Sequence, residues 1–177
     1  MRVIGIDPGS KACGYGIVEQ DGTKLLFIDS GEIRPKQSLP IERRLHMISE
    51  EIAGKIENFS PACMSIEKVF VAKNSKSALH LGQARGAVLA TAAACDVEVF
   101  EYSSTTVKKS VASNGRASKE EVQKMVSLLT GRKSFESSDE SDAIAIAVCH
   151  INNAKAADKI PGFSVRKSSR RRRFTLR

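Results

Sequence analysis

The sequence predicts an α/β fold with a five-stranded mixed sheet, its first three strands antiparallel, flanked by helices. Three observations predict it. The region up to Ile33 contains three successive strand-like segments, with an Asp-Gly hairpin signal between the second and third. An amphipathic helical segment follows, and two more strand-like segments then alternate with helical ones. The 177 residues suffice for one such domain with a buried core.

The first predicted strand is apolar and ends in a single carboxylate. Val3–Ile6 is followed by Asp7 and then by the turn signal Pro8-Gly9. A carboxylate at the end of a buried strand needs an ion pair, a hydrogen bond or a metal to offset its desolvation. Asp-Pro-Gly is also ordinary turn chemistry, so Asp7 is either a turn cap or a functional acid.

The next elements are two strands and an amphipathic helix. The strands are predicted at 14–19 and 24–33. Pro40 marks the start of the helix, which ends before Pro61. Its apolar stripe recurs at spacings of four, three, four and four residues: Ile41, Leu45, Ile48, Ile52 and Ile56.

The fourth predicted strand, 62–67, also ends in an acid, Glu67. A loop at 68–74 mixes apolar residues with two lysines. A long helix rich in Ala and Gly follows from about 75 to 94. Its small side chains allow another backbone to approach closely, so it either packs tightly on the sheet or forms a subunit contact.

The last predicted elements are a strand at 97–101, one or two helical turns at 105–111, and two helices with capping-box starts. Ser118 and Glu121 begin one helix, and Ser137 with Glu140 repeats the pattern before the last one. The apolar run 143–149 predicts that this last helix is buried on most sides.

The distribution of charge predicts a domain and a tail, and the cysteines indicate the cellular compartment. The net charge is +8, but residues 166–177 hold seven basic and no acidic residues, which leaves 21 basic and 20 acidic residues elsewhere. We therefore expect a domain at 1–155 and a basic, disordered tail at 156–177, which either binds phosphates or only solubilises the chain. Four cysteines without C-x-x-C spacing predict reduced thiols, and the lack of a signal peptide or membrane span predicts a cytoplasmic protein.

Two further acids, Asp139 and Asp142, stand three residues apart at the start of the last helix and therefore share a face. Acids at a helix N-terminus are stabilising in themselves, which is the simpler interpretation. With Asp7 and Glu67 they could instead converge over one end of the sheet. Four carboxylates without a Ser-His or Cys-His grouping suit Mg²⁺, and two such ions about 3.5–4 Å apart could hydrolyse a phosphodiester. The three histidines show no ligand spacing and are expected at the surface or in packing: His46, His80 and His150.

In its order of motifs, the chain resembles the RuvC-type Holliday junction resolvases of the RNase H-like nuclease superfamily over residues 1–155. The matching blocks are Gly5-Ile6-Asp7-Pro8-Gly9, Ile66-Glu67-Lys68-Val69-Phe70, Ala72-Lys73-Asn74, Ser77-Ala78-Leu79, Leu81-Gly82-Gln83-Ala84-Arg85-Gly86, Phe100-Glu101-Tyr102, Val107-Lys108 and Asp139 with Asp142-Ala143. The resemblance implies an RNase H-like fold.

The resemblance also implies the site residues. The catalytic acids, which bind two Mg²⁺ or Mn²⁺ ions, would be Asp7, Glu67, Asp139 and Asp142. The DNA-binding residues would be Phe70, Lys73, Arg85, Lys108 and Lys119, with Phe70 stacking on bases. Lys68 departs from the family, which usually has Gln after the catalytic Glu, and leaves the local role of that position open.

The implied activity is that of a homodimer, paired through the helix beginning near Ser75, that resolves Holliday junctions in recombination and repair. It would nick two strands of like polarity symmetrically, leaving 5′-phosphate and 3′-hydroxyl ends, and would work with the RuvA–RuvB branch-migration complex. Two alternatives are a non-catalytic protein that binds four-way junctions and an actin-like phosphotransferase. The second needs two related domains, and this chain has length for one.

Overall fold

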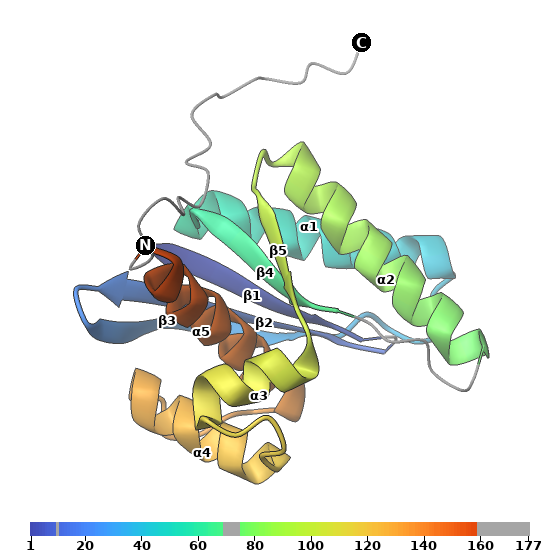
Figure 1. The fold of residues 1–177 in the computed structure, drawn as a ribbon. Coiled ribbons are helices and arrows are strands. Elements are labelled where there is room, and N and C mark those ends of the chain that lie inside the picture. The colour runs from blue at the N-terminus through green and yellow to red at the C-terminus, as the bar shows by residue number, and fades with distance from the viewer. Residues whose placement is uncertain (10, 69–74, 159–177) are drawn as a thin grey trace.

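A five-stranded mixed sheet forms the centre of the computed structural model, which describes residues 1–9, 11–68 and 75–158 (Figure 1). The strands are β1 (Arg2–Pro8), β2 (Cys13–Asp21), β3 (Lys24–Ile33), β4 (Cys63–Glu67) and β5 (Val99–Tyr102). Their order across the sheet is β3-β2-β1-β4-β5. β1 to β3 pair antiparallel, whereas β1, β4 and β5 run parallel. The predicted sheet is confirmed.

Helices cover both faces of this sheet. They are α1 (Ile41–Phe59), α2 (Ser75–Ala94), α3 (Ser104–Ala112), α4 (Lys119–Thr130) and α5 (Ser138–Asp158). α1 and α2 lie on one face, and α3, α4 and α5 lie on the other (Figure 1). The expected one or two turns near 105–111 form the nine-residue α3, whose N-cap Ser103 accepts a hydrogen bond from the backbone N–H of Thr106.

Strand alternation sorts the core into two layers. On β1, Val3 packs in the layer with α3, α4 and α5, whereas Ile4 and Ile6 pack in the layer with α1 and α2. All four of Val3, Ile4, Ile6 and Val18 are fully buried. The alternation puts Gly5 and Asp7 on the same face as Val3, which is the face that α5 covers.

α5 lies unusually close to β1 and β2. A Cβ atom added at Gly5 would come within 2.1 Å of the carbonyl oxygen of Ala143, and one added at Gly14 within 2.1 Å of the carbonyl oxygen of Asp139. Residues 143–149 are at most 1% exposed, as the apolar run predicted. The two strand glycines therefore set how near the N-terminal half of α5 approaches the sheet.

The two capping-box predictions have different outcomes. The box at α4 is complete, because Ser118 and Glu121 satisfy each other's backbone N–H. At α5 the prediction is half wrong: Ser137 Oγ accepts from the N–H of Glu140, but the Glu140 carboxylate does not return to Ser137. It bonds to Ser30, Arg132 and the backbone of Glu136 instead.

Other predictions concern the cysteines, the tail and the membrane. All four cysteines are free thiols. α5 continues to Asp158, so the boundary drawn at residue 155 falls inside this helix. The rest of the predicted tail lies outside the described residues. Among the helices described here, none has the length and hydropathy to cross a bilayer.

Candidate active site

The candidate site lies where β1 and β4 end. The parallel register pairs Ile6 with Ile66, so the following residues, Asp7 and Glu67, stand at the same level on neighbouring strands. Both carboxylates belong to the face that α5 covers, because Gly5 and Ser65 two residues earlier lie against that helix. The expected convergence of the two strand-end acids thus follows from the register.

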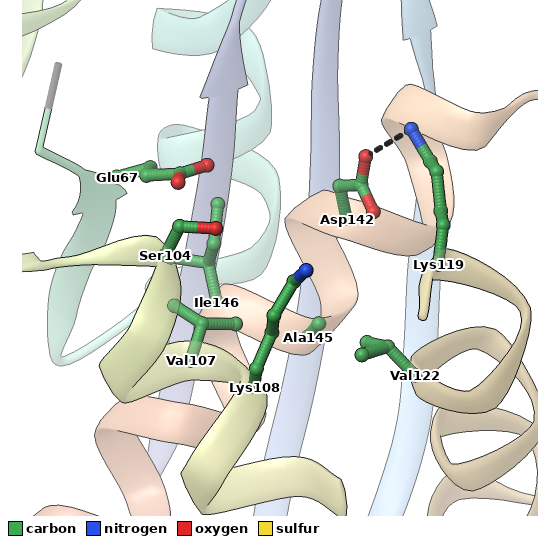
Figure 2. A pocket seen from close by; sticks show the side chains of 9 residues that line it. All are labelled: Glu67, Ser104, Val107, Lys108, Lys119, Val122, Asp142, Ala145 and Ile146. Atoms are coloured by element: carbon green, nitrogen blue, oxygen red, sulfur yellow. Dashed lines mark ion pairs between the residues drawn. The ribbon is translucent and has the colours of Figure 1, made fainter. Parts of the chain in front are cut away.

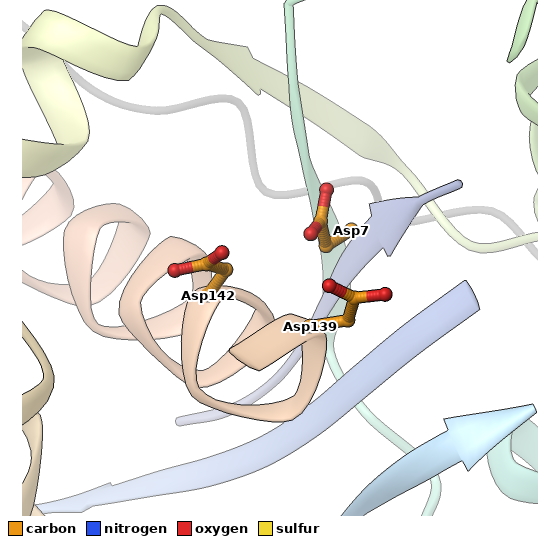
Figure 3. Close-up of side chains that lie close together, drawn as sticks. All are labelled: Asp7, Asp139 and Asp142. Carbon is orange, nitrogen blue, oxygen red and sulfur yellow. The ribbon is translucent and has the colours of Figure 1, made fainter. Parts of the chain in front are cut away.

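The first turn of α5 brings two more acids to this point. Oxygen atoms of Asp7, Asp139 and Asp142 all lie within 4.8 Å of one another. Their three carboxylates gather between the end of β1 and the beginning of α5 (Figure 3). The close approach of Gly14 to the backbone of Asp139 places this turn directly over the strand.

Glu67 stands somewhat apart and borders an adjoining pocket. This pocket is lined by Glu67, Ser104, Lys108, Lys119 and Asp142, together with apolar side chains of α3, α4 and α5. Figure 2 shows Glu67 and Ser104 on one side, Asp142 with Lys119 on the other, and Lys108 pointing between them. Glu67 does not belong to the 4.8 Å group of three acids, and the metal-binding role of all four acids remains a prediction.

The acids of the site repel one another. Burial, followed by the negative charges of Asp142, Asp139 and Glu67, raises the pKa of Asp7 from 3.8 to about 7, although Lys119 opposes the shift. Burial also raises the pKa of Glu67, against a lowering hydrogen bond from Ser104. An excess of negative charge at this depth is the environment that a divalent cation would relieve.

The described lysines of the site are placed differently from each other. Lys119 Nζ lies 2.6 Å from Asp142 Oδ2, and this bond raises the pKa of Lys119 although burial lowers it. Lys108 lines the pocket and lowers the pKa of Glu67 by its charge. Both therefore face the candidate acids, and their contact with DNA remains a prediction.

Arg85, predicted to bind DNA, bonds within the protein. Its guanidinium donates to the carbonyl oxygen of Glu67 at 2.8 Å and to the carboxylate of Glu101 at 2.5 Å. It thus ties α2 to the ends of β4 and β5, through the backbone of Glu67 and the side chain of Glu101. The other two predicted DNA contacts, Phe70 and Lys73, lie outside the described residues.

Sequence reasoning missed three residues that shape the site. Gly14 admits the α5 backbone, Ser104 hydrogen-bonds Glu67, and Glu140 anchors the first turn of α5. The glycines alternating along β2 were a usable signal, because glycine inside a strand often marks a close backbone approach. Nothing in the local sequence distinguished Ser104 or the buried orientation of Glu140.

The donor set fits a hard divalent cation. Carboxylate oxygens are the ligands that Mg²⁺, Ca²⁺ and Mn²⁺ prefer, and Mg²⁺ in particular binds through a few carboxylates and substrate phosphates. The described part of the chain presents three such groups around one point, with a fourth beside them. His150, by contrast, is buried away from this site against Cys63 and Tyr102, as expected for a packing residue.

The sequence is similar to a family of junction nucleases over most of its length. The profile of the family described as crossover junction endodeoxyribonuclease RuvC matches residues 3–150. The RuvC protein of Trichlorobacter lovleyi is 45% identical over 153 residues, which are 86% of each chain. That of Geobacter sulfurreducens is 45% identical over 154 residues, 87% of this chain and 94% of the other.

Solved structures show the same similarity. Thermus thermophilus RuvC in complex with a Holliday junction substrate has a TM-score of 0.84 at 32% identity, covering 88% of this chain and 96% of the other. The yeast mitochondrial Holliday junction resolvase has a TM-score of 0.62 at 14% identity, covering 85% of this chain and 77% of its own, and shares the fold.

Proposed function

The chain belongs to the RuvC family of crossover junction endodeoxyribonucleases, and on this premise we propose how its acidic site resolves a Holliday junction. The proposed reaction is hydrolysis of one phosphodiester bond in each of two strands of like polarity. The observation that carries the proposal is the convergence of Asp7, Asp139 and Asp142 within 4.8 Å, with Glu67 beside them.

The four acids are proposed to hold two Mg²⁺ ions, for which Mn²⁺ could substitute. Divalent cations in this position would lower the pKa of a bound water toward neutrality and would neutralise charge on the leaving oxygen during in-line displacement. The negative charges of Asp142, Asp139 and Glu67 all raise the pKa of Asp7, and this coupling to the three other acids supports a central place for Asp7 among the ligands.

The chain's own cations are proposed to orient the scissile phosphate. Lys119 bonds to Asp142 in the structure, and engagement of Asp142 by a metal would release this ammonium for a phosphate oxygen. Lys108 points into the same pocket from α3, so the phosphate would lie between two positive charges. Phe70 and Lys73 are proposed to contact the bases and backbone near the junction centre.

Water attack in line with the 3′ oxygen would break the P–O3′ bond. The phosphorus keeps the new oxygen and becomes a 5′-phosphate, while the departing oxygen takes a proton and becomes a 3′-hydroxyl. Such ends can be religated, as a recombination intermediate requires.

Symmetric nicking requires two sites, and we propose that a homodimer supplies them through α2. This helix exposes Leu79 to 61% and carries the small, exposed Gly82 and Gly86, which would let a second backbone approach. Cooperation with the RuvA–RuvB branch-migration complex is proposed from family membership alone.

The direct test is nicking of a synthetic four-way junction compared with a linear duplex of the same sequence. We expect nicks only on the junction and only with Mg²⁺ or Mn²⁺ present, at symmetric positions and with ends that DNA ligase can seal. Junction binding without any nicking under these conditions would instead identify a non-catalytic junction-binding protein.

A further inference from the structure

Glu140 is a fully buried carboxylate between the two candidate metal ligands of α5. Its side chain is 1% exposed, and it follows Asp139 directly and precedes Asp142 by two residues. Successive residues of a helix are about 100° apart around the axis, so Asp139 and Asp142 lie about 60° from each other. Glu140 lies about 160° from Asp142, on the other side of the same turn.

Three donors from outside α5 bind this carboxylate. Oε1 accepts from Ser30 Oγ at 2.5 Å and from Arg132 Nη2 at 3.1 Å. Oε2 accepts from the backbone N–H of Glu136 at 2.6 Å. A buried carboxylate is costly unless its oxygens are satisfied, and each oxygen here has at least one donor.

These donors come from two separate parts of the fold. Ser30 belongs to the edge strand β3, and Arg132 and Glu136 belong to the connection between α4 and α5. Arg132 is itself held in place, because its guanidinium lies 4.8 Å from the centre of the Phe27 ring on β3. Glu140 therefore joins the first turn of α5 to a fixed frame on the side away from the acids.

We propose that Glu140 is a positioning residue, which sets the place and rotation of this turn so that Asp139 and Asp142 face Asp7. The inference rests on the proposed metal-dependent activity. Three carboxylates within 4.8 Å repel one another, and without an anchor the end of the helix could relieve the repulsion by moving or rotating. The network on the opposite side of the turn resists that movement before any metal binds.

The test is Mn²⁺ binding to the full-length chain, measured by calorimetry for wild type and Glu140→Ala. We expect the variant to bind Mn²⁺ at least about 10-fold more weakly, the range seen when an outer partner of a metal ligand is removed. The Mg²⁺ concentration that half-saturates nicking should rise by the same factor, while the rate at saturating Mg²⁺ stays close to that of wild type.

The matched control is Asp29→Ala. Asp29 neighbours Ser30 on β3, and its carboxylate accepts from Tyr15 and Lys55, on the sheet face away from α5. Its loss should lower the unfolding midpoint without changing Mn²⁺ affinity. Ser30→Ala removes a single hydroxyl donor to Glu140 and keeps the question answerable if Glu140→Ala does not fold. It should weaken Mn²⁺ binding about threefold, less than Glu140→Ala, because the donors from Arg132 and Glu136 remain.

The outcomes separate the two proposals. Wild-type Mn²⁺ affinity in a folded Glu140→Ala or in Ser30→Ala would overturn the positioning role and leave the nuclease proposal intact. An equal loss of affinity in Asp29→Ala would also overturn it, because general destabilisation would then be the cause. Failure of the wild-type chain to bind Mn²⁺ at all would overturn both proposals.

Discussion

Two groups of carboxylates lie on opposite sides of the first turn of α5 and differ in what surrounds them. On one side Asp7, Asp139 and Asp142 crowd together, and one lysine ammonium, Lys119, pairs with Asp142. On the other side Glu140 stands alone with a donor for each oxygen. One group is stabilised by the protein itself, and the other lacks the positive charge that would make it stable. Such an unbalanced negative charge is expected at a cation site, because a bound cation relieves the repulsion among the carboxylates and this relief favours binding.

The largest expected effect comes from removing the central acid. Asp7→Asn should lower junction nicking by more than about 100-fold, since even outer partners of metal ligands contribute 10–100-fold. Junction binding in the absence of divalent ions should change little. Gel assays of cleavage and binding on the same four-way junction measure both. Nicking at the wild-type rate would exclude Asp7 from the catalytic site.

A second test of the difference between the two sides of the turn is a substitution that moves the start of α5 away from the sheet. In Gly14→Ala the new methyl carbon would meet the carbonyl oxygen of Asp139 at 2.1 Å, so the turn must shift. We expect about 10- to 100-fold slower nicking and a loss of ~1–3 kcal/mol in unfolding free energy. Gly54→Ala on α1 is the control, because its added carbon meets no atom within 4 Å. It should leave nicking unchanged.

The pH dependence of metal-free stability tests the crowding of acids around Asp7. The folded-state pKa of Asp7 is raised to about 7, so the folded protein holds this proton more tightly than the unfolded chain does. The contribution of this proton to the free energy of unfolding is fully present below about pH 4 and is lost as the pH rises through 7. Because Asp7 is partly exposed, we expect a loss of roughly 2 kcal/mol between these limits after allowing for solvent screening.

Urea unfolding in EDTA at several pH values checks this prediction. The difference in unfolding free energy between Asp7→Asn and wild type should grow in favour of the variant from pH 5 to pH 8. Taking the difference between the two unfolding free energies at each pH cancels the titration of groups that both proteins share. A difference that stays flat with pH would contradict the crowded-acid description.

The smallest expected effect comes from removing the lysine that pairs with Asp142. Lys119 is half exposed, so Lys119→Ala should cost at most ~1 kcal/mol of stability. Its charge lowers the pKa of Asp7, and its loss should shift the pH midpoint of Mg²⁺-dependent nicking upward. The rate should fall about fivefold through the lost phosphate contact. Lys124→Ala, exposed on the same helix, should change neither quantity.

The acids at the ends of strands could be predicted because they follow from local rules. Apolar runs ending in Asp7 and Glu67 predicted two strand ends, and the three-residue spacing of Asp139 and Asp142 predicted a shared helix face. The resemblance of the motifs to RuvC-type resolvases and the RNase H-like α/β fold are both confirmed. The metal-binding and DNA-binding roles of individual residues remain predictions.

The features that could not be predicted depend on contacts between distant segments. Glu140 has the position of a capping-box residue, but its carboxylate is buried against one donor from β3 and two from the α4–α5 connection, which the local sequence does not reveal. Arg85 belongs to a block shared with the family, yet its bonds to Glu67 and Glu101 arise only when α2 packs beside β4 and β5. In both cases tertiary packing, and not the local sequence, determines the hydrogen-bond partners of the side chain.

The most direct test of the central claim compares the effect of Mg²⁺ on the unfolding free energy of wild type and Asp7→Asn at pH 8. Without divalent ions, Asp7→Asn should be the more stable protein, because it lacks one of the crowded charges. Saturating Mg²⁺ should stabilise wild type by at least ~2 kcal/mol and the variant much less, which would reduce or reverse the difference. Equal stabilisation of both proteins, or a less stable variant in EDTA, would contradict a cation site built on Asp7.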